Sequence, residues 1–407
     1  MKCPWYRLGP QARLKSASEA ALTLRTRQFE RILLIKPSAV GDVIHTLPVL
    51  TKLRARYPRA RIDWLLTPAI AELVRHHPAL SNIVLFDRQG FTRFGSDWSA
   101  SVGLLKLLAD IRRTRYDLVI DLHGQFRSAV LTLASGARVR IGFDRPREAV
   151  KRASLERLGR QALLHGWTGA REASWLTYTH RIAIPTLDVH AIDRYLWLGA
   201  ILGFDKEPPE LNIPVPVAAL SRIDALLERK GLHRTSLAVL VPGTVWQTKH
   251  WHVEGFAEVA RYLVGTGHAV VLAGSSKERR RCQAVAAGCP AACNLAGETT
   301  LSELAAMIQR ATICVTNDSG AMHLAVALGR PVVSVFGPTD PVWVGPYRRP
   351  QAVLQARIPC APCYLRKLRS CPHDHLCMKE ITPLMVIERI RRTLAEGDFY
   401  EPGSLAS

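Results

Sequence analysis

The sequence predicts an α/β protein in which two doubly wound halves, each built on a parallel sheet, follow one another along the chain. Short apolar runs of strand length alternate with helical patterns from Arg31 onward, which is typical of parallel sheets covered by helices. The alternation starts again at Ser236, after a polar, Pro-containing passage at residues 203–217. A length of 407 residues is enough for two or three domains with cores of their own. We therefore expect two Rossmann-like domains joined by that passage.

The first half is predicted to contain four strands with helices between them. The strands are expected at residues 32–35, 61–66, 82–86 and 118–121. The helices are expected at residues 43–56, 69–76 and 101–113. Lys36-Pro-Ser-Ala-Val-Gly-Asp42 is expected to form the loop after the first strand, and Leu122-His-Gly-Gln-Phe-Arg127 follows the fourth. Residues 143–165 are Arg-rich and are expected to form a loop and a helix.

The second half is predicted to repeat this plan. Its strands are expected at residues 237–241, 269–273, 312–316 and 332–336. One helix is expected to end at Leu263 and another to follow Lys277. Two more are expected at residues 301–309 and 322–328. Gly329 and Pro331 end the last of these helices.

The loop after the strand at residues 312–316 is a candidate ligand site. It carries Asp318-Ser-Gly320, where the first helical turn leaves backbone N–H groups unpaired and available to an anion. Open α/β sheets bind ligands outside the carboxyl ends of their strands. The alternative is a polar residue that only caps an ordinary core helix. His323, one helical turn further, and the polar loop Gly337-Pro-Thr-Asp-Pro341 after the next strand favour the ligand site.

The chain is strongly basic, with 55 Lys and Arg against 34 Asp and Glu and a net charge of +21. Such a surface attracts polyanions, which include nucleic acid, anionic membranes and phosphorylated substrates. No apolar run approaches the length of a membrane span. The basic residues 1–27 lack the apolar core and cleavage site of a signal peptide. We expect them to form a solvated tail, with contact to a membrane surface as the alternative.

Four of the nine cysteines cluster near the C-terminus, at Cys360, Cys363, Cys371 and Cys377. Without a secretory signal, a reducing compartment is expected. The cluster resembles a zinc site only loosely, because its single CxxC is not answered by a second, although His373 and His375 could add ligands. We expect a thiol-lined structural loop without a tightly held metal.

Two common nucleotide-binding signatures are missing from the chain. No GxGxxG directly follows a strand and opens a helix, which weakens a nicotinamide-enzyme interpretation. No GxxxxGK[ST] is present either, which excludes a P-loop.

Several segments together resemble the family nine glycosyltransferases, and within them the lipopolysaccharide heptosyltransferases. In chain order they are Ile35-Lys-Pro-Ser-Ala-Val-Gly-Asp-Val-Ile-His-Thr-Leu-Pro-Val-Leu50, Ala170-Arg-Glu172, His190-Ala-Ile-Asp-Arg194, Thr244 with Lys249-His-Trp251, Asp318-Ser-Gly320 with His323, and Gly337-Pro-Thr-Asp-Pro341. The likeness spans roughly residues 31–390, and the order of the motifs is more specific than any one of them. The passage at residues 170–194 is most similar to the enzymes that add the first core heptose.

The resemblance implies a GT-B fold, in which two Rossmann-like doubly wound domains face a central cleft. Residues 1–30 would be a basic N-terminal extension and residues 396–407 a C-terminal tail. Residues 31–210 would hold the acceptor and residues 211–395 the nucleotide-sugar. The implied reaction is inverting transfer of heptose from ADP-heptose to the Kdo/heptose inner core of lipopolysaccharide, without a cofactor or metal. The chain has no convincing Asp-x-Asp loop, which agrees with metal independence because a metal-bound pyrophosphate needs carboxylate ligands.

The sequence also departs from the first-heptose enzymes, so the acceptor is left open between the first and the second heptose. Val245 stands where a second Thr is common in them. The span after Phe86, including Phe91-Thr-Arg-Phe-Gly95, is poor in the arginines that they place near acidic acceptor sugars. The C-terminal cysteine loop is more similar to second-heptose enzymes.

Glycosyl transfer needs a base for the acceptor hydroxyl and stabilisation of the departing diphosphate. The resemblance assigns Asp42 as the base, and the alternative is a plain carboxylate at a helix N-terminus. Lys249 is expected to meet the leaving phosphate, unless it is a solvated surface lysine. The residues expected to bind the donor are Thr244, Lys249, Asp318, Ser319, Gly320 and His323.

The expected donor residues differ in what they can offer. Asp318 is anionic and is expected to accept hydrogen bonds from sugar hydroxyls, while Ser319 and Gly320 present N–H groups to the diphosphate. His323 is expected to donate to the diphosphate, or to be a satisfied helix histidine. For the acceptor's acidic groups the candidates are Arg127 and Arg171, with surface salt bridges as the alternative.

The implied partners are ADP-heptose and an anionic glycolipid. The enzyme would then lie in the cytoplasm, peripherally attached to the inner face of the inner membrane. Each juxtamembrane Lys or Arg would contribute roughly 1 kcal/mol to this attachment. Another nucleotide-sugar or acceptor within the family is the first alternative. A basic nucleic-acid-binding protein is the second, but the chain lacks a recognition motif, and no nucleic acid is expected. A non-catalytic sugar-nucleotide binder is the third, and Asp42 argues against it.

Overall fold

The first half of the protein is a parallel sheet that is buried on both faces, as the sequence predicts. The computed structural model describes residues 24–205, 207–208, 210–233 and 236–396. Within these ranges the first sheet has the strand order β3-β2-β1-β4-β5-β6, and its strand pairs are parallel. The strands are β1 (Arg31–Ile35), β2 (Arg61–Leu66), β3 (Asn82–Leu85), β4 (Leu118–Asp121), β5 (Val139–Phe143) and β6 (His180–Ile182). Ile32 and Leu34 of β1 face one apolar cluster and Leu33 and Ile35 face another, so helices cover both sides.

The second half repeats this topology. Its described strands have the order β12-β11-β10-β7-β8-β9, which is the same doubly wound pattern. They are β7 (Leu237–Val241), β8 (Ala269–Leu272), β9 (Cys293–Asn294), β10 (Ala311–Asn317), β11 (Val332–Phe336) and β12 (Val353–Gln355). The prediction missed the short strands β6, β9 and β12, as well as β5, whose apolar run is interrupted by Arg140 and Gly142. The predicted fold class, two doubly wound α/β halves, is confirmed.

Helices connect the strands within each half. In the first half they are α2 (Val40–Arg56), α3 (Pro68–Val74), α4 (Arg88–Thr92), α5 (Trp98–Thr114), α6 (Phe126–Ala134), α7 (Glu148–His165), α8 (Ala191–Leu196) and α9 (Gly199–Leu202). In the second half they are α10 (Val217–Arg229), α11 (Val253–Gly265), α12 (Arg279–Gly288), α13 (Leu301–Arg310), α14 (Gly320–Ala327), α15 (Pro341–Val344), α16 (Leu376–Lys379) and α17 (Pro383–Glu396).

Helix α2 begins three residues earlier than predicted, and this corrects the expected loop through Asp42. The Asp42 carboxylate accepts a hydrogen bond from the Ala39 N–H at 3.2 Å, which closes the first turn from Val40 onward. Asp42 is therefore the third residue of the helix rather than the end of a loop.

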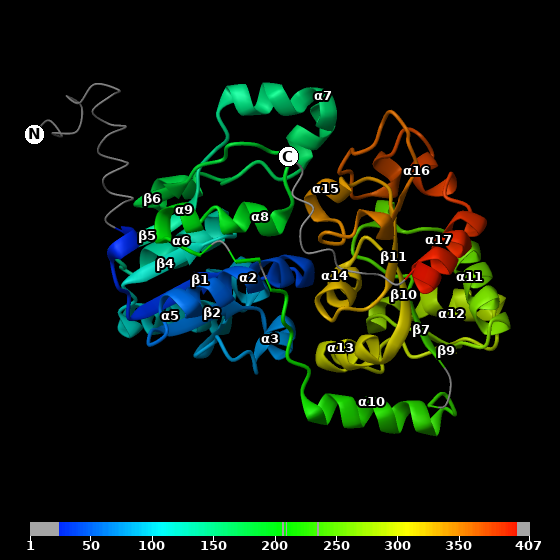
Figure 1. Cartoon of the computed structure of the whole chain (residues 1–407). Helices are drawn as coiled ribbons and strands as arrows, with labels where there is room; N and C mark the ends of the chain where they lie inside the picture. Colours follow the sequence, from blue (N-terminus) through cyan, green and yellow to red (C-terminus); the bar gives the residue numbers. More distant parts are fainter. Residues whose placement is uncertain (1–23, 206, 209, 234–235, 397–407) are drawn as a thin grey trace, which may run out of the picture.

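The two halves lie side by side and share an apolar cluster (Figure 1). The described residues between Gly203 and Pro216 form no helix or strand. Helix α10, at the bottom of Figure 1, follows this passage and packs against α13 of the second half. The start of α2, after β1, meets the start of α14, after β10, between the halves.

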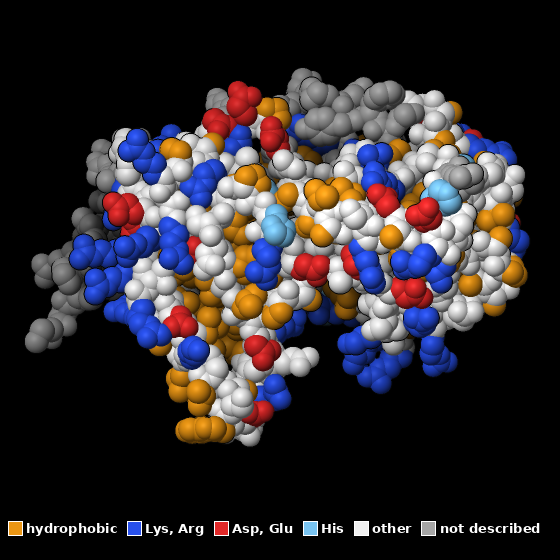
Figure 2. Space-filling view, turned by 90° about the horizontal axis from the view of Figure 1, so that it is seen from below, with side chains coloured by type: hydrophobic (Ala, Val, Ile, Leu, Met, Phe, Trp, Pro, Cys, Tyr) orange, Lys and Arg blue, Asp and Glu red, His pale blue; other side chains and the backbone are white. Residues whose placement is uncertain are grey.

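The surface carries the excess of basic side chains that the composition predicts. Lys and Arg are spread over both halves in the view of Figure 2, and hydrophobic side chains gather on a projection of the first half at the lower left. Among the helices of the described ranges, none has the length and apolar character needed to cross a membrane.

Candidate active site

Asp42 lies at the carboxyl end of β1, in the first turn of α2. Its carboxylate is 3.3 Å from the Lys36 ammonium and accepts a hydrogen bond from the Tyr195 hydroxyl at 3.2 Å. Lys36 is buried and also donates to the Leu122 carbonyl at 3.2 Å. The Asp42 side chain is 42% exposed, so the carboxylate is held from one side and accessible from the other.

The environment of Asp42 keeps its carboxyl ionised. Loss of solvation raises the pKa of Asp42, but attraction to the Lys36 ammonium and the hydrogen bond from the Ala39 N–H outweigh this, and the pKa lies below its usual value. Burial and repulsion by Lys36 lower the pKa of the adjacent His123 to about 4. At neutral pH the site therefore holds a carboxylate beside a neutral imidazole.

The predicted donor residues Thr244, Lys249 and Asp318 are brought together from two loops. The Lys249 ammonium is 2.6 Å from the Asp318 carboxylate and 4.4 Å from the centre of the Trp246 ring. The Thr339 hydroxyl donates to the same Asp318 oxygen at 2.5 Å, and the Thr244 hydroxyl donates to the Asp318 carbonyl at 3.1 Å. The Lys249 side chain is only 14% exposed, so the alternative of a solvated surface lysine is wrong.

The N-termini of α2 and α14 pack directly against each other. A Cβ at Gly320 would lie 2.8 Å from Cβ of Val40, and a Cβ at Gly41 would lie 2.5 Å from Cδ2 of His323, so a larger residue at either glycine would force them apart. Ser319 is the N-cap residue, yet its buried hydroxyl makes no hydrogen bond within the described residues. The alternative that its side chain only caps the helix is therefore not supported.

Three neutral histidines lie at this contact between the halves. Nε2 of His45 is 3.1 Å from Nδ1 of His323, and the His45 ring packs edge-on against His190 with the ring centres 5.0 Å apart. Burial, more than any neighbouring charge, lowers the pKa of His323 to about 4 and that of His190 to about 3, and lowers that of His45 as well. Because His45 occupies Nδ1 of His323, the expected hydrogen bond from His323 to a diphosphate could involve only Nε2.

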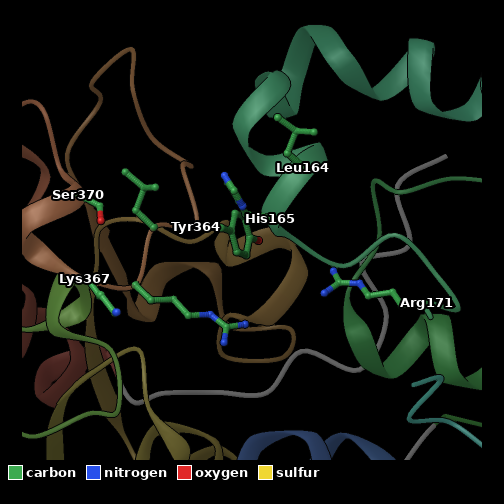
Figure 3. Close-up of a pocket in the computed structure, with 8 residues that line it drawn as sticks. Leu164, His165, Arg171, Tyr364, Lys367 and Ser370 are labelled. Atoms are coloured by element: carbon green, nitrogen blue, oxygen red, sulfur yellow. The ribbon is translucent and has the colours of Figure 1, made fainter. Parts of the chain in front are cut away.

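The two arginines expected to meet the acceptor lie in different cavities. Arg127 lines a small recess together with Ser38 and His123, which places it near Asp42. Arg171 lines a larger cavity of about 410 Å³ between the halves (Figure 3). The structure therefore does not join the two arginines into one cluster.

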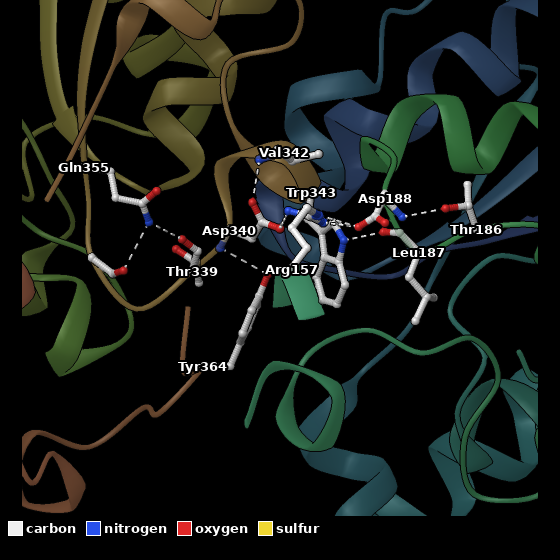
Figure 4. Close-up of polar contacts among 11 residues, drawn as sticks. Arg157, Thr186, Leu187, Asp188, Thr339, Asp340, Val342, Trp343, Gln355 and Tyr364 are labelled. Atoms are coloured by element: carbon white, nitrogen blue, oxygen red, sulfur yellow. Dashed lines mark hydrogen bonds and ion pairs between the residues drawn. The ribbon is translucent and has the colours of Figure 1, made fainter. Parts of the chain in front are cut away.

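The Gly337–Pro341 motif, predicted as a second polar loop of the ligand site, also joins the two halves (Figure 4). The Arg157 guanidinium of α7 forms an ion pair with Asp340 at 2.7 Å and donates to Asp188 at 2.5 Å. The Trp343 indole N–H donates to the Leu187 carbonyl at 2.5 Å. The motif therefore holds the first half close to the donor residues.

Sequence reasoning gave no role to Lys36, Tyr195 or Thr339, although all three contact predicted site residues. Tyr195 lies 153 residues from Asp42 in the chain. Lys36 and Thr339 stand inside the segments that carry the family resemblance, and this was the signal that could have identified them.

The cysteine loop, defined as residues 360–377, keeps its thiols unpaired. The cysteines of the described ranges form no disulfide, and Cys3 lies outside these ranges. No group of three or more His, Cys, Asp or Glu in the described part of the chain is arranged to hold a metal ion. A structural loop without a tightly held metal stays a prediction.

Known proteins similar to this chain fall into one family. Residues 104–158 and 146–372 match glycosyltransferase family 9 (heptosyltransferase). Lipopolysaccharide heptosyltransferase 1 of Pseudomonas aeruginosa is 31% identical over 349 residues, 82% of this chain and 86% of that protein. Lipopolysaccharide heptosyltransferase 2 of Escherichia coli K12 is 27% identical over 378 residues, 90% of this chain and 99% of that protein.

Solved structures with similar folds agree with this match. ADP-heptose lps heptosyltransferase II of E. coli has a TM-score of 0.68 at 24% identity, covering 91% of this chain and 100% of that one. E. coli heptosyltransferase WaaC with ADP-2-deoxy-2-fluoro heptose has a TM-score of 0.64 at 22% identity, covering 89% and 99%. These likenesses extend over both halves and show the same fold.

Proposed function

The chain belongs to glycosyltransferase family 9, the heptosyltransferases, and we propose that it transfers heptose from ADP-heptose to the inner core of lipopolysaccharide. Its fold is GT-B, with two Rossmann-like domains. The relatives are lipopolysaccharide heptosyltransferases, and one similar structure holds an ADP-heptose analogue. Both first-heptose and second-heptose enzymes are among them, which leaves the receiving sugar to experiment.

The observation that carries this proposal is the direct packing of α2 against α14. It sets Asp42 and the N-terminus of α14 on opposite sides of one contact, with Gly41 against His323. A base on one domain and an anion site on the other is the arrangement that glycosyl transfer between two bound substrates needs. We assign acceptor binding to the first domain, residues 31–210, and nucleotide-sugar binding to the second, residues 211–395.

In the proposed reaction, Asp42 takes the proton from the acceptor hydroxyl as its oxygen attacks the anomeric carbon of the heptose. The attack comes from the face opposite the diphosphate, so the configuration inverts while the bond to the diphosphate oxygen breaks. The electron pair of that bond leaves with ADP. Lys249 and the backbone N–H groups of Ser319 and Gly320 would stabilise the charge on the departing diphosphate.

The acceptor would come from a membrane, and one surface of the first domain fits that environment. Trp98 is 84% exposed, and Phe94, Val102 and Leu105 are also exposed. Residues 98, 102 and 105 share one face of α5. Lys106 follows Leu105 and is exposed, and Arg93, before the helix, is exposed and forms an ion pair with Asp97 at 3.3 Å. Aromatic and apolar side chains flanked by cations suit an anionic bilayer surface. We therefore place the enzyme in the cytoplasm, peripherally bound to the inner membrane.

A panel of nucleotide-sugars offered with Kdo–lipid A, scored by product mass, tests the proposal. A product heavier by one heptose residue, formed with ADP-heptose and not with hexose nucleotides, is the expected result. Kdo–lipid A that already carries one heptose, run in parallel, shows which heptose is added. Transfer of a hexose alone, or no transfer to either acceptor, would contradict the proposal.

A further inference from the structure

A cavity of about 410 Å³ lies between the two domains, apart from the contact of α2 with α14. Its walls come from the end of α7, from Arg171 and from the cysteine loop (Figure 3). The polar side chains that line it are His165, Arg171, Tyr364, Arg366, Lys367 and Ser370. None of its lining residues carries a carboxylate. Such a volume is sufficient for a charged sugar.

The cysteine loop is fixed in place by hydrogen bonds to the loop after β7. The Gln247 N–H donates to the Arg366 carbonyl at 3.1 Å, and the Gln247 side chain accepts from the Leu368 N–H at 3.1 Å. The Thr248 hydroxyl donates to the Leu365 carbonyl at 2.5 Å. These bonds position Arg366 and its neighbour Lys367 in the lining of the cavity through the loop backbone and the side chains of Gln247 and Thr248, not through the side chains of Arg366 and Lys367.

The cavity adjoins the donor side of the proposed active site. The Arg366 guanidinium carbon lies 4.8 Å from the centre of the Trp246 ring, and the Lys249 ammonium lies 4.4 Å from the same ring centre. On the first domain, the backbone of Arg171 is held by its N–H, which donates to the Gly124 carbonyl at 2.8 Å in the loop after β4. A molecule in the cavity would therefore lie next to the donor residues.

Two cations of the cavity, Arg171 and Arg366, repel each other. Burial lowers the pKa of Arg171, and repulsion by Arg366 lowers it further. Attraction to Glu172, the next residue in the chain, offsets this lowering in part, and the Glu172 carboxylate also accepts from the Phe126 N–H at 2.9 Å. An anion between Arg171 and Arg366 would relieve the repulsion and use guanidinium geometry, which suits carboxylates and phosphates.

We propose that this cavity binds the acidic groups of the acceptor saccharide, and that Arg366 and Lys367 of the second domain hold them together with Arg171 of the first. The inference rests on the proposed function for the identity of the acceptor. It adds to that function a role for the cysteine loop, which would form the wall of the acceptor site that comes from the donor domain. Carboxylates of acidic sugars and phosphates share the required chemistry.

The test compares Arg366→Gln/Lys367→Gln with Arg369→Gln, which removes one cation from an exposed position of the same loop outside the cavity. We expect the double variant to raise the KM for de-acylated Kdo–lipid A at least tenfold, with kcat and the Kd for ADP within about twofold of the native values. Arg369→Gln should change none of these. An unchanged KM in the double variant would overturn the inference, and a raised Kd for ADP would reassign the cavity to the donor.

Modified acceptors identify the acidic group. If carboxylates bind there, methyl esterification of the acceptor should weaken binding to the native protein and cause little further loss in the double variant. If phosphates bind there, removal of the phosphates from the acceptor should weaken binding to the native protein and cause little further loss in the double variant. Equal losses in native and variant protein with both modified acceptors would overturn the inference.

Calorimetric binding of de-acylated Kdo–lipid A without a donor separates this inference from the proposed function. Binding that depends on Arg366 and Lys367 without any heptose transfer would contradict the function and support the cavity. Normal heptose transfer together with acceptor binding that does not depend on either residue would support the proposed function and contradict the inference about the cavity.

Discussion

The Lys249 ammonium lies 2.6 Å from the Asp318 carboxylate, and their side chains are only 14% and 5% exposed. Each therefore neutralises the other's charge beside the N-terminus of α14. Thr339 also donates to the Asp318 carboxylate, so this oxygen is already held by two donors. A diphosphate that approaches α14 would compete with Asp318 for the lysine, so we predict that the two residues affect donor binding together.

Lys249→Ala should lower turnover at least a few tens-fold, because charge on the departing diphosphate would develop unopposed. It should also lower the free energy of unfolding by about 1–3 kcal/mol, since Asp318 is left buried without its cation. The double variant Lys249→Ala/Asp318→Asn should regain stability in denaturant unfolding without regaining turnover. Recovery of turnover in the double variant would mean that Lys249 only neutralises Asp318.

Asp42→Ala should bind ADP-heptose with near-native affinity and lose roughly a hundred- to ten-thousand-fold in turnover, the usual contribution of a general base. Calorimetry and single-turnover rates measure the two effects separately. Asp42→Asn is the matched control, because it keeps a side-chain acceptor for the Ala39 N–H and removes the base. If either variant kept more than a tenth of the native rate, Asp42 would be only a residue of the helix N-terminus.

Lys36→Met should move the acid limb of the pH–rate profile to higher pH. The rate depends on ionised Asp42, which is present above its pKa and lost as the pH falls through it. Lys36 holds that pKa below its usual value, so removing the ammonium should raise it. The profile of kcat/KM from about pH 3 to pH 8 measures the shift, since the native acid limb lies below the usual pKa of an aspartate, about 3.9. An acid limb at the same pH in both proteins would show that Asp42 is not the group that titrates.

The free energy of unfolding should fall as the pH is lowered from about 6.5 to about 4, because the histidines buried at the domain contact stay neutral in the folded protein while they bind protons in the unfolded chain. Their folded pKa values, about 3 for His190 and about 4 for His323, lie below the unfolded value, so the unfolded chain binds more protons in this window. Each histidine then contributes a slope of up to about 1.4 kcal/mol per pH unit, with stability rising as the pH rises. His190→Asn keeps a helix-capping side chain and should reduce the slope of unfolding free energy against pH. A slope equal to that of the native protein would exclude His190 from this effect.

Trp98→Ala/Leu105→Ser should reduce binding to vesicles that contain anionic lipid at least fivefold in a flotation assay, because both side chains are exposed on one face of α5. Turnover of a de-acylated acceptor should stay at the native rate. Leu384→Ala, which changes a side chain 71% exposed on α17 of the second domain, is the control and should bind as the native protein does. Native-like flotation of the double variant would remove α5 from the membrane surface.

The sequence was sufficient for the strands at the centre of each sheet. Strands such as β1, β7 and β10 are buried on both faces, so they are nearly continuous apolar runs that stand out between polar loops. Edge strands β6, β9 and β12 have two or three residues and no such run, and they were missed. Helix α2 was predicted to start late because its first turn is fixed by the Asp42 side chain, a contact that periodicity does not register.

By itself the sequence determined the two doubly wound halves and placed the candidate loops after their strands, since parallel strands end at one edge of a sheet. It also carried the motifs that join the chain to its family. The tertiary structure alone decided the partners of those motifs. Tyr195 reaches Asp42 across 153 residues, and His45 reaches His323 across 278. Such pairs depend on how two separately formed domains pack, and neither local propensity nor hydrophobic periodicity contains that information.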